Sequence, residues 1–200
     1  MAYERFTATN AALLLIDHQV GTMGWVRSIP FEEMKRNALM LAKTASILKL
    51  PVVLTSSMEE YAQGPLLAEL EAILPAEFAA RVKRVGIVNA IDDENFAAAV
   101  KATGRKKLII AGVTNDVCTV FPALSLLGQG YDVQVVADVS GSPSKMSDDM
   151  ALRRMAQGAA ARARQGAAQD RRGPAGPRRG NRAHDLARDR QRSAHPGARR

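Results

Sequence analysis

Cys118, the single cysteine of the 200-residue chain, closes the run KKLIIAGVTNDVC. The aliphatic residues at 108–113 predict a buried strand of a parallel sheet, and the apolar spacing after them predicts a helix. Ligands of open α/β sheets bind at such strand-to-helix turns. If Asn115 caps the helix, Cys118 lies in its first turn, where free N–H groups and the helix dipole lower a thiol pKa. The alternative is a small buried apolar residue, the commoner role of a free cysteine.

Charged residues fall at the ends of two other predicted strands. Asp17 ends the strand at 11–16, and Lys83 and Arg84 lie in a strand at 81–88. A carboxylate at a strand end can accept a thiol proton, and a cation beside it can hold both anions in place. Taken singly, Asp17 could equally be a cap or turn residue, and the two cations a solvated edge. Their joint placement on one sheet edge is what favours a catalytic site.

The elements that must position these residues alternate along the chain. Strands are expected at residues 11–16, 51–56, 81–88, 108–113 and 132–137, and helices at residues 31–48, 65–74, 92–102, 116–128 and from 147. Near-continuous aliphatic strands between amphipathic helices predict a doubly wound α/β domain, with a parallel sheet covered on both faces. The absence of GxGxxG and GxxxxGK[ST] patterns argues against a dinucleotide site and a P-loop.

The charge of the chain divides it into two parts. Residues 1–152 hold 14 Lys and Arg against 17 Asp and Glu, whereas residues 153–200 hold 14 Arg and only 3 Asp. We expect a domain at 1–157 and a disordered tail at 158–200, because the Arg-, Ala-, Gly- and Pro-rich end lacks the apolar residues that offset ordering entropy. Two origins remain open for this tail: translation out of frame of a GC-rich gene, or a genuine basic tail that binds nucleic acid without sequence preference.

The composition also indicates the cellular compartment in which we expect the protein. A single cysteine excludes an internal disulfide, and no apolar run approaches the ~20 residues that span a bilayer. The first ten residues, MAYERFTATN, lack the apolar segment of a signal peptide. We therefore expect a cytoplasmic protein without a membrane partner, and nucleic acid only as a partner of the tail.

Long motifs resemble a known family, the isochorismatase-like cysteine hydrolases, and within it the YcaC-like branch of bacterial hydrolases. The resemblance covers about residues 7–157 and is carried by LLLIDHQVG at 13–21, LPVVLTSS at 50–57, GPLLAEL at 64–70, RVGIVNAIDDENFAAAVKATGRKKLIIAGVTNDVC at 84–118 and FPALSLLGQGYDVQVVADVSG at 121–141. It implies a three-layer α/β/α fold around a six-stranded parallel sheet. Because the tail replaces the segment where relatives continue, we expect the sixth strand to be missing.

The resemblance also assigns roles to residues. The family's Asp–Lys–Cys triad matches Asp17, Arg84 and Cys118, with Lys83 as the rival for the basic position. A cis peptide is implied at Val113–Thr114, and the backbone N–H groups of Thr114 and Cys118 are implied to face a developing oxyanion. Further candidates for the pocket are His18, Gln19, Trp25, Asn115 and Phe121. For His18 a helix-start or surface role is the alternative, and for the aromatic residues a core role.

The expected activity is that of a metal-independent cysteine hydrolase, which cleaves a small amide or related C–N bond through an acyl-thioester on Cys118. No cofactor is expected, and no metal, because the TSSMEEYAQG segment at 55–64 lacks the histidine of the D-x-H pattern that related nicotinamidases carry. The partners implied are a small-molecule substrate and further copies of the chain, as in relatives. The alternative is an inactive α/β remnant or binding protein, because the C-terminal part of the fold is replaced.

Overall fold

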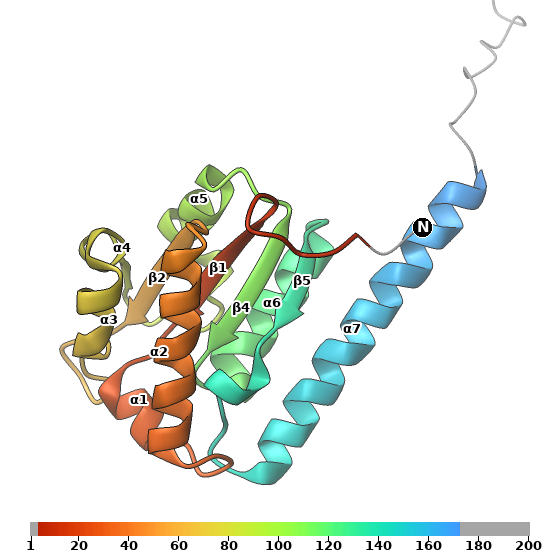
Figure 1. The fold of residues 1–200 in the computed structure, drawn as a ribbon. Coiled ribbons are helices and arrows are strands. Elements are labelled where there is room, and N and C mark those ends of the chain that lie inside the picture. The colour runs from red at the N-terminus through yellow and green to blue at the C-terminus, as the bar shows by residue number, and fades with distance from the viewer. Residues whose placement is uncertain (1–3, 173–200) are drawn as a thin grey trace, which may run out of the picture. The chain divides into compact units, whose positions relative to one another are not determined.

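The structure is a computed structural model that describes the backbone of residues 4–172 and the side chains of residues 4–164. Its centre is a five-stranded, wholly parallel sheet in the order β3-β2-β1-β4-β5 (Figure 1). The strands are β1 (Ala11–Ile16), β2 (Val52–Ser57), β3 (Val82–Arg84), β4 (Lys107–Gly112) and β5 (Asp132–Val135). The doubly wound prediction is confirmed, and the described residues contain no sixth strand.

Helices cover both faces of the sheet. They are α1 (Val20–Gly24), α2 (Phe31–Ile47), α3 (Ala68–Ile73), α4 (Pro75–Ala79), α5 (Glu94–Ala102), α6 (Val120–Gly128) and α7 (Lys145–Arg172), with short turns η1 (Ala90–Asp92), η2 (Asn115–Thr119) and η3 (Ala137–Val139). None of the helices in this part of the chain is both long and apolar enough to cross a bilayer.

β1 supplies alternate side chains to two cores. Leu13 and Leu15 pack with buried residues of α2 and α3 on one face, whereas Leu14 and Ile16 pack with α5, α6 and the start of α7 on the other. All six residues of β1 are buried. A strand buried on both faces needs no polar alternation, which explains its continuous AALLLI sequence.

Two predicted elements are shorter than expected. The strand predicted at 81–88 is only Val82–Arg84, because the chain turns at Gly86, whose φ of 93° is left-handed. The helix predicted at 65–74 is only Ala68–Ile73, and it ends before Pro75 as expected because Leu74 is not helical (φ −132°, ψ 60°); a separate helix, α4, begins with Pro75 in its first turn.

The last described helix, α7, continues across residue 157, where the sequence predicted the end of the folded domain. α7 continues through Gly158 to Arg172, and within it the Arg162 guanidinium donates to the Gly130 carbonyl at 2.9 Å. A Cβ at Gly158 would lie 2.3 Å from Leu124, so this part of the helix packs against α6. The prediction of disorder from residue 158 rested on missing apolar periodicity and overlooked the helix propensity of Ala, Arg and Gln. The rest of the predicted tail, 173–200, lies outside the described residues.

Candidate active site

Asp17 lies directly after β1, at the carboxyl edge of the sheet where the strand order reverses. Its φ of 58° is left-handed, and its N–H donates to the Thr55 carbonyl at 2.9 Å. The neighbouring strands are β2 on one side and β4 on the other. Its side chain is only 5% exposed. A carboxylate so buried requires a partner.

That partner is Arg84, the last residue of β3, whose side chain is 1% exposed. One guanidinium nitrogen donates to both carboxylate oxygens of Asp17. The other two donate to the Thr55 hydroxyl at 3.0 Å and the Ile87 carbonyl at 2.6 Å. Arg84 therefore reaches across β2 and is held on three sides.

Lys83, the rival for the basic position, points away from this site. Its side chain is 56% exposed and its ammonium pairs with Glu59 at 2.8 Å. Successive side chains of a strand face opposite sides, so only one of the two cations can turn toward Asp17.

Cys118 lies in η2, a single π-helical turn between β4 and α6. The predicted first turn of an α-helix capped by Asn115 is wrong, because residues 115–119 form a π-helical turn and the side-chain oxygen of Asn115 accepts no backbone N–H; its amide nitrogen donates to Asp148 at 2.9 Å. The predicted cis peptide at Val113–Thr114 is present. The Cys118 thiol lies beside the Asp17 carboxylate and the Thr114 N–H, close enough for both to shift its pKa.

The pKa of the Cys118 thiol is raised, whereas the sequence predicted that it would be lowered. Burial raises the pKa of Cys118, and the negative charge of Asp17 and its hydrogen bond raise it further, against weaker opposite effects of the Thr114 N–H and Arg84. Burial also raises the pKa of Asp17, and Arg84 opposes this. The expected decrease from the helix dipole does not occur, first because the sulfur is buried and second because a buried carboxylate lies beside it. One proton is thus shared between two acidic groups, with the thiol as its resting place.

A cavity of about 310 Å³ opens over these three residues. Its other lining residues are Gln19, Thr22, Trp25, Ser57, Met58, Gln63, Gly86, Ile87, Val88, Thr114, Asp116, Val117 and Pro143. Of the five predicted pocket residues, Gln19 and Trp25 line the cavity, as does Thr114, which was predicted as a backbone donor to the oxyanion.

The other three predicted pocket residues do not line the cavity. His18 is buried with its Nε2 3.0 Å from the Val139 carbonyl, and burial lowers its pKa to about 4. Asn115 is fully buried, and Phe121 is partly buried and packs against the core, with the Arg154 guanidinium 5.2 Å from its ring.

Gln19 and Thr55 have structural roles that the sequence left unnamed. The Gln19 amide donates to the carbonyls of Ser57 and Gly64, and its oxygen accepts from the Ser57 N–H at 2.9 Å. It therefore fixes residues 57–64 as a cavity wall. Thr55 donates to the Val82 carbonyl at 2.7 Å while it accepts from Arg84. The change from aliphatic to hydroxyl residues in PVVLTSS was the signal that could have indicated Thr55.

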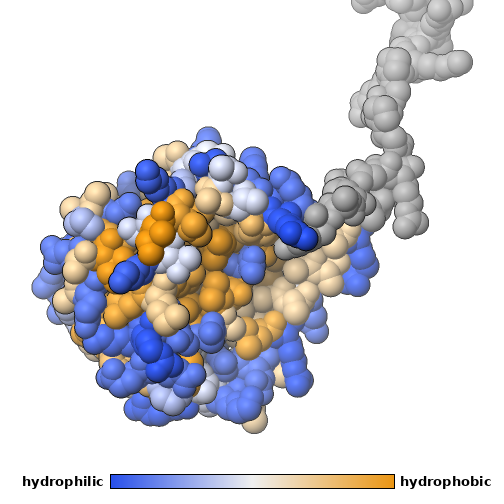
Figure 2. Space-filling model, viewed as in Figure 1, coloured by the Kyte–Doolittle hydropathy of each residue, from blue (hydrophilic) through white to orange (hydrophobic). Residues whose placement is uncertain are grey.

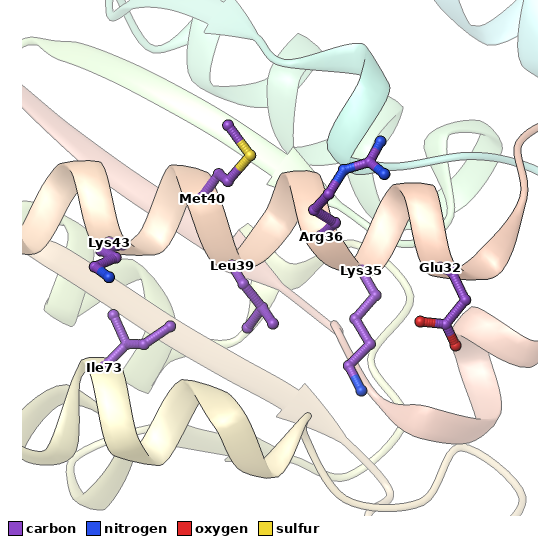
Figure 3. A pocket seen from close by; sticks show the side chains of 7 residues that line it. All are labelled: Glu32, Lys35, Arg36, Leu39, Met40, Lys43 and Ile73. Carbon is purple, nitrogen blue, oxygen red and sulfur yellow. The ribbon is translucent and has the colours of Figure 1, made fainter.

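A second depression, of about 400 Å³, lies between α2 and α3 (Figure 3). It is lined by the stems of Lys35, Arg36 and Lys43 with Leu39 and Ile73 among others, and Lys35 is paired with Glu69 at 2.6 Å. Neither a thiol nor a buried carboxylate lines it, so the first cavity is the candidate active site. Among the side chains that the structure describes, no three of His, Cys, Asp and Glu gather as metal ligands would.

Comparison with known proteins agrees with this geometry. The isochorismatase domain family matches residues 11–165. The probable hydrolase YcaC of Escherichia coli K12 is 44% identical over 158 residues, which are 79% of this chain and 75% of that protein. The crystal structure of the Escherichia coli protein, described as an octameric hydrolase of unknown specificity, superposes with a TM-score of 0.76 over 79% of this chain and 76% of that one.

Two other solved structures extend the comparison. YcaC from Pseudomonas aeruginosa, solved with hexane-2,5-diol and covalent acrylamide, is 44% identical, with a TM-score of 0.76 over 79% of this chain and 77% of that one. The nicotinamidase PncA of Bacillus subtilis shares the fold at 14% identity, with a TM-score of 0.60 over 72% and 92% of the two chains. By domain match, sequence identity and fold, the chain belongs to the isochorismatase family, within its YcaC-like branch of hydrolases.

Proposed function

We propose that this protein is a cysteine hydrolase of small amides or related C–N compounds, with Asp17, Arg84 and Cys118 as its catalytic residues. The observation that carries the proposal is the contact of the Cys118 thiol with a buried carboxylate that Arg84 holds, at the floor of a cavity. A nucleophile beside a base that a third group orients is the arrangement that covalent catalysis requires.

In the proposed reaction, Asp17 takes the thiol proton as the Cys118 sulfur bonds to the carbonyl carbon. Arg84 stays charged throughout, so it stabilises the anions and transfers no proton. When the C–N bond breaks, the proton on Asp17 passes to the leaving nitrogen, and an acyl-thioester remains on the sulfur. Asp17 then takes a proton from water as that water attacks the thioester, which releases the acid and returns the proton to Cys118.

The carbonyl oxygen gains negative charge in both attacks and needs donors. The Thr114 N–H lies close enough to the Cys118 sulfur to lower its pKa, so it lies beside the reacting atom. We propose that this N–H and that of Cys118 stabilise the oxyanion, a contribution worth about 10²–10³ in rate per donor in other hydrolases.

The relative solved with covalent acrylamide supports a reactive nucleophile in this branch. Acrylamide is an electrophilic primary amide that adds to thiolates. In this chain the one thiol lies in the cavity. That relative therefore supports Cys118 as the proposed nucleophile and a small amide as the kind of compound that the site admits.

Acyl-enzyme trapping tests the proposal. Incubation with p-nitroacetanilide or p-nitrophenyl acetate, followed by mass spectrometry, should place one acetyl group on Cys118. Cys118→Ser should form no thioester, and Asp17→Asn should slow turnover by about 10² or more. Lys83→Ala, which removes the neighbouring cation, is the control and should retain activity. If the folded protein is neither acetylated at Cys118 nor hydrolyses these compounds, the proposal is wrong and the protein is the inactive remnant.

We also propose that the chain forms a homo-oligomer, as the octameric relative does. Figure 2 shows apolar side chains on the face that α2 occupies in Figure 1. Met40 and Ile47 of α2 are 60% and 71% exposed, and Leu48 is 50% exposed. Large apolar side chains at such exposure favour burial between subunits. Light scattering of the purified chain tests this assembly.

A further inference from the structure

The turn η2, which carries Cys118, is held by a segment that follows β5 in the chain. The Asn115 N–H, at the start of η2, donates to the Gly141 carbonyl at 2.8 Å. The side-chain amide of Asn115 donates to a carboxylate oxygen of Asp148, in the first turn of α7, at 2.9 Å. Contacts between segments far apart in the sequence therefore determine where η2 lies.

Asp148 joins two buried donors through a single oxygen atom. The oxygen that accepts from Asn115 also accepts from the Ser142 hydroxyl at 2.8 Å. Asn115 and Ser142 are both fully buried. The other acceptor near the Asn115 amide, the Ala137 carbonyl, lies at 3.5 Å, which is too long for a strong hydrogen bond. Without the carboxylate, both donors would be buried and without a good acceptor, and this is the arrangement that a protein avoids most strongly.

The two ends of η2 are fixed by different contacts. At its last residue, the Thr119 hydroxyl donates to the Gly112 carbonyl at 2.6 Å, within the same strand-to-helix connection. At its first residue, the Asn115 side chain is held by Asp148, and Cys118 lies between the two ends. Loss of the Asp148 contact would loosen one end of the turn, so the sulfur would move. A displacement of about 1 Å at the reacting atoms can lower a rate about 10²-fold.

We propose that Asp148 is a positioning residue of the active site, which holds η2 so that the Cys118 sulfur stays beside Asp17. Asp148 is not among the residues that line the cavity, so it acts through Asn115 and not on the substrate. It also gives α7, the last helix that the structure describes, a part in the reaction. The catalytic consequence rests on the proposed function, because it takes Cys118 as the nucleophile.

Acetylation of Cys118 by p-nitrophenyl acetate, followed by mass spectrometry, tests this role. In Asp148→Ala the maximal rate of acetylation should fall about 10- to 10²-fold, while the half-saturating concentration changes by less than about threefold, because the cavity walls remain. Asp148→Asn should recover most of the rate, since its amide oxygen can accept both hydrogen bonds. Asp149→Ala is the matched control: this neighbouring carboxylate pairs with the exposed Lys145 at 2.8 Å, and its loss should leave the rate unchanged.

Alkylation by iodoacetamide as a function of pH gives a second readout, which a loss of stability alone would not move. Burial and the neighbouring Asp17 raise the pKa of the Cys118 thiol. A displaced turn weakens both effects, so alkylation of folded Asp148→Ala should begin at lower pH, and Asp148→Asn should reverse the shift. Val100→Ala, which truncates a buried side chain of α5 away from the cavity, is the control for reduced stability and should leave the alkylation profile and the acetylation rate unchanged.

The outcomes separate this inference from the proposed function. A wild-type acetylation rate and alkylation profile in Asp148→Ala would overturn the positioning role and leave Cys118 as the nucleophile. An Asp148→Asn variant as slow as Asp148→Ala would also overturn it, since the accepting oxygen is retained. If the wild type is not acetylated, the proposed function fails, and the alkylation profile decides the positioning role by itself. If Asp148→Ala does not fold, Asn115→Ala replaces it with the same expected results, because it removes the donor of the same hydrogen bond.

Discussion

Asp17 and Cys118 share one proton beside the permanent charge of Arg84. The buried pair cannot hold two negative charges cheaply, so the resting state is a thiol next to a carboxylate. In the mechanism that we propose, the nucleophile is therefore generated during attack and not stored as a thiolate. This has opposite consequences for thiol reactivity and for turnover.

We expect Asp17→Asn to lower the pKa of Cys118 while it lowers hydrolysis. The substitution removes the negative charge and the acceptor that raise the thiol pKa, and Arg84 remains to stabilise the thiolate. Iodoacetamide alkylation of Cys118 should shift to lower pH, whereas turnover falls by about 10² or more because the base is lost. Lys83→Ala serves as the control for both measurements. An alkylation profile that moves to higher pH in Asp17→Asn would contradict the shared proton.

His18 connects the site to stability at acid pH. Burial lowers its pKa to about 4 from its ordinary value of 6.5, so the unfolded chain binds a proton more readily than the folded one. The stability is fully present above pH 6.5 and is lost as the pH falls toward 4. At pH 5 this histidine alone should cost about 2 kcal/mol relative to pH 7. Urea unfolding of the wild type and His18→Gln at both pH values measures it. The difference between the two pH values should shrink in the variant.

At the scale of elements, the cavity depends on how closely α1 approaches the segment after β2. The Gly21 N–H donates to the Gln63 carbonyl at 2.9 Å. A Cβ at Gly21 would lie 1.9 Å from the Ala62 carbonyl oxygen, whereas one at Gly24 in the same helix would meet nothing within 4 Å. Only a residue without a side chain permits this approach.

We predict that Gly21→Ala lowers stability by about 1–3 kcal/mol, because the backbone must move to admit the methyl group. It should also reduce activity, since Thr22 and Gln63 on the two sides of this contact line the cavity. Gly24→Ala is the matched control, and the better helix propensity of alanine should leave it as stable or up to about 1 kcal/mol more stable. Thermal unfolding of both variants measures the difference. Equal melting temperatures of the two variants would show that α1 and the segment after β2 can move apart without a loss of stability.

At the scale of the whole molecule, residues up to Arg164 form one compact unit. Arg154 lies over the Phe121 ring, and Arg162 is bonded to Gly130, so α7 is held to this unit by some of its own arginines. The arginines from 171 onward are dense in sequence. The arginines of the C-terminal end therefore form two groups. Arg154 and Arg162 make contacts that the structure describes, and those from 171 onward are known from the sequence alone.

We expect limited trypsin digestion to leave a fragment that ends near Arg164 and to cut slowly at Arg153 and Arg154. The protected bonds lie in a packed helix, and local unfolding must precede cleavage. Mass spectrometry of the stable fragment gives its end. A fragment that ends at residue 153 or 154 would show that α7 is not held to α6, and the predicted boundary at 157 would then be closer to the truth.

The sequence determined the order of strands and helices, the parallel sheet, and the placement of Asp17, Arg84 and Cys118 at one sheet edge. These follow from local apolar patterns and from the rule that parallel strands share one carboxyl edge. The cis peptide at Val113–Thr114 followed from the family resemblance, which the matched motifs carried.

Only the tertiary structure decided what these residues do to one another. It turned Arg84 and not Lys83 toward Asp17 and placed His18 in the core. It also buried the Cys118 thiol and brought a carboxylate beside it, and these two effects reversed the expected pKa shift of Cys118. Side-chain direction, burial and charge separation depend on contacts between segments far apart in the chain. Electrostatic energies vary steeply with those distances and with exclusion of water, and no local pattern encodes either.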